Sequence, residues 1–116
     1  MEDQKPFRGL QGKTPEALFG KLRTPCYILD ERILRENGKA LKDLMDRTGC
    51  RVLLAQKAFS NYDLYPVLAP YLAGTEASGL YEARLGREKM PQGEVHVFSG
   101  AYRDDEMDEV LQYADH

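Results

Sequence analysis

The sequence predicts an α/β fold in which parallel strands alternate with helices, and two observations support this. From residue 26 onward, short apolar segments alternate with amphipathic segments in the order β-α-β-α-β-α-β-α. Strands joined across helices of this length run parallel and are connected by right-handed crossovers. A complete TIM-type (β/α)8 barrel needs about 250 residues, whereas this chain has 116 and stops at "ADH", where another strand would begin. We therefore expect an incomplete parallel (β/α)8 barrel, consisting of its first β/α units.

The first 29 residues differ from the rest of the chain. Residues 1–13 are polar and contain proline and glycine, which predicts a flexible lead-in. Within residues 14–29, Thr14 as N-cap and Pro15 at the first helical position predict a short helix. The apolar residues 26–29, "CYIL", should form a short strand.

Residues 30–116 are predicted to form the barrel part, beginning with a long helix. Asp30 is a suitable N-cap, and Gly49 supplies the expected C-terminal stop. Gly38 lies inside the helix at a cost of about 1 kcal/mol, which suggests close packing against a neighbour. Apolar residues at helical spacing form one stripe: Ile33, Leu34, Leu41, Leu44 and Met45.

The remaining segments alternate between strand and helix. Strands are bounded by turn residues, and the last helix opens with acidic residues that suit its positive end. The expected strands are 51–56, 74–79 with its terminal loop and 94–99, and the expected helices are about 62–72, 80–90 and 104–114.

Composition excludes several classes of function. With 42% hydrophobic and 30% charged residues, the chain suits one modest core. No apolar run approaches the roughly 20 residues of a membrane span, and the N-terminus lacks the layout of a secretory signal. A net charge of −3 provides no basic footprint for nucleic acid. These observations predict a cytoplasmic protein that binds neither nucleic acid nor membrane.

Cysteine and histidine usage is sparse. Cys26 and Cys50 are far apart and form no CxxC pair, which predicts reduced, half-buried thiols rather than a disulfide. His96 and His116 have no partners at metal-ligand spacing. The sequence therefore predicts no metal site.

Lys57 is the main candidate for chemistry. It follows the apolar segment "VLLAQ", and functional groups of parallel α/β proteins collect at the carboxyl ends of strands. A lysine in an apolar pocket loses its proton more readily, because desolvation disfavours the charged form, and its neutral amine can form a Schiff base. The alternative, favoured by position alone, is a lysine that extends to solvent at a strand end.

Four segments together resemble one enzyme family. They are "TPCYILDERILRENGKALKDL", "LLAQKAFS", "EASGLYEARLG" and "EVHVFSGAYRDDEM". In this order and spacing they look like the beginning of carboxynorspermidine decarboxylase, in the alanine racemase and ornithine decarboxylase class of pyridoxal-phosphate enzymes. The resemblance covers about residues 24–116. The pieces "SGLYEARLG" and "FSGAY" favour this family over diaminopimelate and ornithine decarboxylases.

The resemblance implies a cofactor, a reaction and a partner. Lys57 matches the lysine that holds pyridoxal 5'-phosphate as a Schiff base at the end of the first barrel strand, and residues 26–29 match a strand of a second, β-rich domain. The implied reaction removes CO2 from carboxynorspermidine or carboxyspermidine, giving norspermidine or spermidine in polyamine biosynthesis. The intact enzyme would be a homodimer. The cofactor's conjugated ring system would accept the electron pair left by decarboxylation.

The chain also departs from the family pattern. Gln56 stands where a smaller or apolar residue is expected, and Gly100 where proline is usual. A glycine-rich phosphate loop, an acidic partner for the pyridine nitrogen and residues lent by a second subunit have no counterpart in these residues. We therefore expect the 116 residues alone to be inactive.

Other residues have weaker claims to the site. Ser78 and Tyr102, each near a strand end, can line the cofactor pocket, although turn or packing roles are more common for such residues. The stretch 74–86 matches neither of two glycine-rich phosphate-binding patterns, the P-loop and GxGxxG. Residues 84–87, with Glu82, are expected to form a solvated helix face, and the acidic run 104–109 either attracts a polyamine or starts the last helix.

Three other functions fit the same residues. The substrate can be diaminopimelate or ornithine instead. The protein can bind pyridoxal phosphate, or pair with a full-length subunit, without catalysis. Finally, the piece can be a domain without a separate role, covering its sheet edges by self-association.

Overall fold

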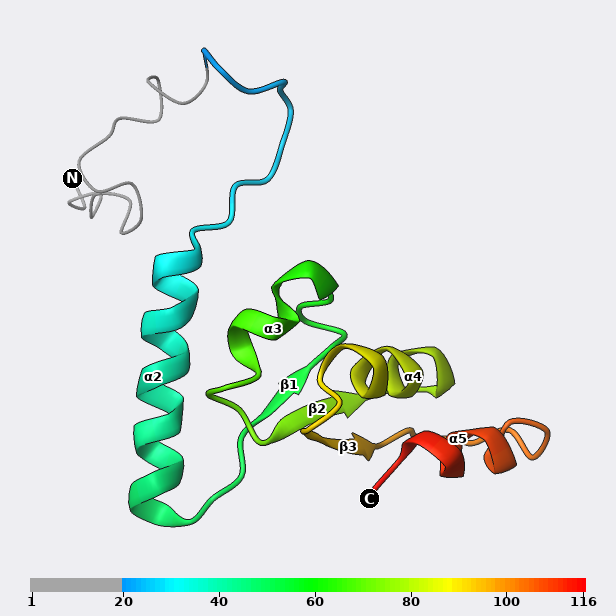
Figure 1. Cartoon of the computed structure of the whole chain (residues 1–116). Coiled ribbons are helices and arrows are strands. Elements are labelled where there is room, and N and C mark those ends of the chain that lie inside the picture. Colours follow the sequence, from blue (N-terminus) through cyan, green and yellow to red (C-terminus); the bar gives the residue numbers. More distant parts are fainter. Residues whose placement is uncertain (1–19) are drawn as a thin grey trace, which may run out of the picture.

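The computed structural model describes residues 20–116 and forms a parallel sheet with helices (Figure 1). The predicted lead-in 1–13 and the helix start at Thr14 lie outside the described residues. The elements are α2 (Glu31–Thr48), β1 (Leu53–Ala55), the 3-10 helix η1 (Tyr62–Leu64), α3 (Tyr65–Leu68), β2 (Gly74–Ala77), α4 (Leu80–Lys89), β3 (Glu94–Val97) and α5 (Met107–Tyr113).

The sheet has three parallel strands in the order β1-β2-β3. This confirms the α/β class and the parallel alternation from β1 onward. Residues 26–29, expected to form a strand of a second domain, are exposed and belong to no strand in the described part of the chain. The reason is that no neighbouring edge pairs with them. Neither a closed barrel nor a second domain is confirmed by the described residues.

The chain extends the sheet once more after α5. The backbone N–H of His116 donates to Val95 O at 3.3 Å, and Val97 N–H donates to His116 O at 2.8 Å. Bonds to the residues before and after His96 are the pattern of a parallel ladder. His116 therefore lies beside His96 along the outer edge of β3.

Helix α2 begins and ends as the sequence predicts. The Asp30 carboxylate accepts from Arg32 N–H at 2.9 Å, and Gly49 adopts a left-handed conformation with φ of 74°. Gly38 is the buried residue of this helix, and a Cβ there would lie 2.7 Å from the Tyr71 ring. The glycine therefore permits close packing of α2 against the α3 region, as expected.

The elements from β1 onward are shorter than predicted, and two of them show why. The first strand spans 53–55 rather than 51–56, because the chain turns after Ala55, whose carbonyl accepts from Ala58 and Phe59 N–H. The helix expected at 62–72 becomes η1 and the single turn α3. Pro70 contributes here, since proline cannot continue a helical hydrogen-bond ladder.

The core lies between the sheet and its helices. One cluster joins Tyr65, Leu68 and Met90, and a second joins Ala77, Ala83 and Val95. Helix α4 packs on β2 and β3 and beside α5. Gly86 allows this approach, because a Cβ there would collide with the Thr75 side chain. The strands thus have one face covered by helices.

Among the described helices, none is both long and apolar enough to cross a membrane.

Candidate functional site

Lys57 lies just beyond the carboxyl end of β1, in the turn that follows Ala55. Its side chain is exposed. The apolar pocket expected around this lysine is not formed by the described residues, because three strands do not enclose an interior at this end of the sheet. The structure places Lys57 at the strand end predicted for it, but in a setting open to solvent.

Gln56, the neighbour of Lys57, is fully buried. Its Nε2 donates to the Glu82 carbonyl at 2.8 Å, and its Oε1 accepts from the Tyr65 hydroxyl at 3.1 Å. The amide therefore joins the end of β1 to both α3 and α4. A smaller or apolar residue, as expected from the family pattern, would leave these polar groups without partners. Gln56 fixes the backbone immediately before Lys57.

Ser78 follows β2 at the same end of the sheet. Its backbone N–H donates to the Glu82 carboxylate at 2.6 Å, so Glu82 turns back toward the residue before the N-cap of α4 instead of lying on a solvated helix face as predicted. The Ser78 hydroxyl is buried and has no hydrogen-bond partner within the described chain. Ala55 pairs with Glu76, and Lys57 and Ser78 each stand two residues further on. The unpaired hydroxyl thus follows the strand beside that of Lys57.

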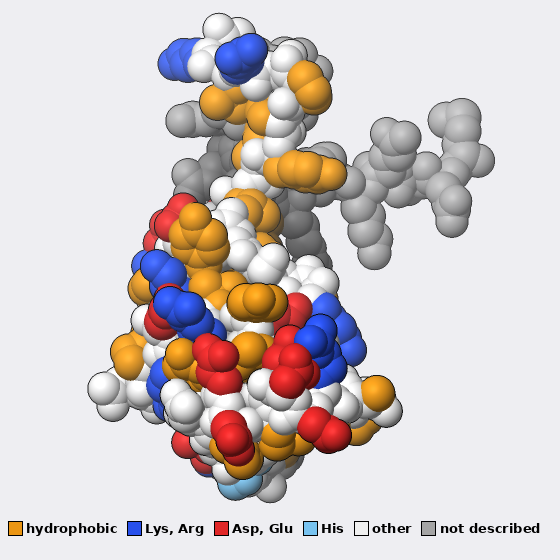
Figure 2. Space-filling model, turned by 90° about the vertical axis from the view of Figure 1, so that its right-hand side faces the viewer, with side chains coloured by type: hydrophobic (Ala, Val, Ile, Leu, Met, Phe, Trp, Pro, Cys, Tyr) orange, Lys and Arg blue, Asp and Glu red, His pale blue; other side chains and the backbone are white. Residues whose placement is uncertain are grey.

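The turn after β3 contributes Tyr102. Its hydroxyl accepts from Ser99 N–H at 3.1 Å and donates to Val97 O at 3.3 Å, so Tyr102 closes this turn. Two exposed aromatic residues, Phe98 and Tyr81, lie at the end of β3 and the start of α4. The arrowheads of β2 and β3 in Figure 1 point toward the side seen in Figure 2, where acidic and basic side chains mingle with hydrophobic ones.

The weaker candidates have different outcomes. At the start of α4, the Glu82 carboxylate already binds the Ser78 N–H, so negative charge stands where a phosphate would lie. Arg87 is half-buried rather than solvated, and donates to Tyr113 O and to Asp115 at 2.6 Å. Asp108 and Glu109 occupy the first turn of α5, as a helix start requires. Cys26 and Cys50 are free and exposed, not half-buried.

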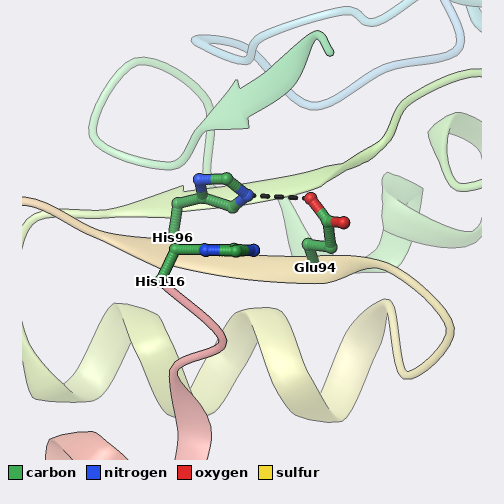
Figure 3. A group of neighbouring side chains, drawn as sticks. All are labelled: Glu94, His96 and His116. Carbon is green, nitrogen blue, oxygen red and sulfur yellow. Dashed lines mark hydrogen bonds and ion pairs between the residues drawn. The ribbon is translucent and has the colours of Figure 1, made fainter.

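A second group of polar side chains was missed by the sequence reasoning. Figure 3 shows Glu94, His96 and His116 together on the side of β3 opposite α4. His96 Nε2 lies 2.9 Å from Glu94 Oε2, and the two imidazole centroids are 4.5 Å apart. The expectation that the histidines lack partners is therefore wrong. No pattern in the sequence indicates this group, because the two histidines are 20 residues apart and meet only through the parallel pairing of residue 116 with β3.

The carboxylates around this group are held ionised. The hydrogen bond from His96 and the ion pair with Arg51 lower the pKa of Glu94. The pKa of Asp115 is lowered by the Val95 N–H, which donates to it at 2.8 Å, and by the Arg87 guanidinium. Asp115 thereby fixes the backbone next to His116.

Comparison with known proteins identifies relatives of this chain. It is 37% identical over 94 residues to a carboxynorspermidine/carboxyspermidine decarboxylase of Herminiimonas arsenicoxydans, covering 81% of this chain and 26% of the relative. It is 37% identical over 98 residues to the protein of the same description from Campylobacter jejuni, and equally to a carboxyaminopropylagmatine decarboxylase of Synechocystis, covering 84% of this chain and 25% of each. No protein-family model matches the chain.

A solved structure agrees with these relatives. Carboxynorspermidine decarboxylase from Campylobacter jejuni, complexed with norspermidine, matches with a TM-score of 0.78 and 37% sequence identity, over 82% of this chain and 26% of that one. The chain thus spans about a quarter of the length of the proteins it matches. The resemblance seen in the sequence is confirmed: over four fifths of its length this chain is a homologue of part of the carboxynorspermidine/carboxyspermidine decarboxylases.

Proposed function

We propose that these residues form part of a pyridoxal-phosphate-dependent decarboxylase that removes CO2 from carboxylated polyamines, with Lys57 as the cofactor-binding lysine. The observation that carries the proposal is the position of Lys57 at the carboxyl end of β1, within a segment homologous to decarboxylases of carboxynorspermidine and carboxyspermidine. The relatives' names share one feature, a carboxylated amine substrate. Norspermidine in the neighbouring structure fits the product of such a reaction.

The residues present fit the cofactor at two points. Lys57 offers an exposed primary amine for the cofactor's aldehyde. Ser78 offers a buried hydroxyl that no group of residues 20–116 satisfies, and an unpaired buried hydroxyl costs about 1–3 kcal/mol unless a ligand completes its bonds. When bound, the cofactor would supply an electron sink for the pair released with CO2.

The chain's own residues would orient these groups. Gln56 anchors the end of β1 through Tyr65 and the Glu82 carbonyl, which limits where Lys57 can move. Glu82 holds the Ser78 backbone in the same way. In the intact enzyme we further propose a complete parallel barrel, a homodimer and a cytoplasmic location, with the open face of this sheet turned inward.

Borohydride trapping tests the attachment. The 116-residue chain, incubated with pyridoxal phosphate and reduced with borohydride, should gain one cofactor mass on the peptide that contains Lys57. Lys57→Ala should abolish this labelling, whereas Lys42→Ala, which removes an exposed lysine paired with Asp46 on α2, should leave it unchanged. Labelling spread over many lysines, or unchanged in Lys57→Ala, would contradict the proposal.

Substrate and activity need the full-length gene product. It should release CO2 from carboxynorspermidine or carboxyspermidine in preference to ornithine and diaminopimelate. A full-length protein that is labelled on Lys57 but releases no CO2 from any of these substrates would instead be a cofactor-binding protein without this catalysis.

A further inference from the structure

Three potential metal ligands meet on the face of β3 away from α4. Glu94 and His96 are two positions apart on β3, so both point to the same side of the strand. His116 is brought to the same place by its backbone bonds to Val95 and Val97. One ligand atom from each residue lies within 4.8 Å of the other two. Figure 3 shows the three side chains side by side.

The backbone that carries these side chains is fixed from behind. Asp115 accepts the Val95 N–H at 2.8 Å and the Arg87 guanidinium at 2.6 Å, and Arg87 also donates to the Tyr113 carbonyl at 2.9 Å. Helix α4 thus ties the end of α5 to the edge of β3 through Arg87. His116 follows directly after this clamp, so its position beside His96 does not depend on the imidazole contact alone.

From this arrangement we propose that Glu94, His96 and His116 bind a divalent transition-metal ion, for which Zn²⁺ is the probe. Two imidazole nitrogens and one carboxylate oxygen form a ligand set that Zn²⁺ takes, with water in the remaining position. Bond lengths of about 2.0–2.2 Å require the ligand atoms to lie a little over 3 Å apart. The Glu94–His96 pair, at 2.9 Å, reaches this spacing with a small separation of the two side chains, and rotation of the exposed His116 ring brings the third ligand to the same distance.

A metal ion must compete with interactions that Glu94 and His96 already make. His96 shares a hydrogen bond with Glu94, and Arg51 binds the same carboxylate at 2.7 Å. Zinc displaces the proton from the histidine nitrogen that it binds, because metal ligands must be deprotonated. Arg51 also donates from Nε to Glu94 Oε2 at 2.8 Å, so the metal must displace that bond, while Oε1 can stay with Arg51. The side chains of Glu94 and His96 are 30% and 29% exposed, so an ion can reach them from solvent.

Zinc titration tests the site. The 116-residue chain, without a histidine tag and carrying Cys26→Ser and Cys50→Ser so that no thiol competes, should bind one Zn²⁺ per chain in calorimetry. His116→Ala should weaken binding by about tenfold or more, and so should His96→Ala and Glu94→Gln, since each removes one ligand. Glu88→Gln is the matched control: this exposed carboxylate pairs with Arg84 on α4, and its loss should leave zinc affinity unchanged.

The zinc titrations of the parent chain and of the His116 variant each test the proposed site. His116 is exposed at the edge of the sheet, so His116→Ala should fold even if substitution of His96 does not. Absence of saturable zinc binding by the parent chain would overturn the proposal and leave the three side chains as a stacking and hydrogen-bonding group. Equal affinity of the parent and His116→Ala would also overturn it, because the metal would then bind elsewhere. The site shares no residue with the cofactor site at Lys57, so it stands or falls independently of the proposed function.

Discussion

The two faces of this small sheet have opposite characters, although the same three strands form both. The face toward α4 buries Thr75, Ala77 and Val95. The buried Gln56 amide there is hydrogen-bonded to both α3 and α4. The face away from α4 carries Glu94 and His96, partly exposed and able to change partners.

The contrast is sharpest between two consecutive residues. Gln56 is fully buried and joins β1 to α3 and α4, whereas Lys57 is exposed to solvent beyond the end of the strand. The two adjacent residues therefore differ in role: the Gln56 amide stabilises the fold, whereas the Lys57 amine is accessible to a ligand. We infer that the covered face maintains the structure, and that the open face and the strand ends supply the chemistry.

The largest stability loss should come from the covered face at Tyr65. This side chain is 0% exposed and packs with Leu68 and Met90. Tyr65→Ala should lower the free energy of unfolding by about 3–5 kcal/mol in urea denaturation, as for other large aromatic truncations. Tyr81→Ala, at an aromatic residue 81% exposed, should change it by less than about 0.5 kcal/mol.

A smaller loss should follow from filling the space at Gly86. Gly86→Ala would push a methyl group into Thr75 and against the Gln56 amide. Overpacking costs about 1–3 kcal/mol, and the better helix propensity of alanine returns up to about 1 kcal/mol. A net loss of up to about 2 kcal/mol is expected from thermal unfolding. Gly100→Ala has open space around its Cβ and should be neutral; equal losses for both would show that α4 does not pack as described.

Alkaline pH should reveal the burial of Tyr65. Desolvation raises its pKa above the usual 10.0, with a smaller contribution from Glu82. The unfolded chain therefore loses this proton first, so the stabilisation is complete below pH 10 and is lost as pH rises beyond it. The decline is at most about 1.4 kcal/mol per pH unit for this group. In Tyr65→Phe this part of the pH dependence should disappear; an identical profile would mean that Tyr65 is solvated.

The smallest expected change in stability concerns Thr75, which is compared with its neighbour on β2, Glu76. The Thr75 hydroxyl is buried without a partner in the described chain, so Thr75→Val should raise stability by about 1 kcal/mol. Glu76→Gln, next along the strand and partly exposed, should change stability by less than about 0.5 kcal/mol. A loss of stability in Thr75→Val would contradict this, because it would mean that the Thr75 hydroxyl forms a hydrogen bond to water or to the protein.

Local signals in the sequence were sufficient for much of the fold. Asp30 and Gly49 marked the ends of α2 because capping is a local interaction, and Lys57 was placed at a strand end because apolar runs and turns are local too. The segment 26–29 belongs to no strand among the described residues, since a strand exists only if another edge pairs with it, and propensity does not reveal that edge.

The polar networks could not be predicted for a related reason. The role of Gln56 depends on the approach of α4 to β1, and the meeting of His96 with His116 depends on the pairing of residue 116 with β3. These contacts join positions about 20 or more residues apart, so spacing along the chain carries no trace of them. The solvent exposure of Lys57 likewise depends on which strands surround it.

The most direct measurement compares Gln56→Ala and Lys57→Ala in both unfolding and cofactor trapping. Gln56→Ala should lose about 1–3 kcal/mol, because the Tyr65 hydroxyl and the Glu82 carbonyl lose their partner, and should still be labelled on Lys57. Lys57→Ala should unfold like the parent chain and lose the label. Equal destabilisation by both substitutions, or a label that persists without Lys57, would contradict the division between a structural face and a reactive strand end.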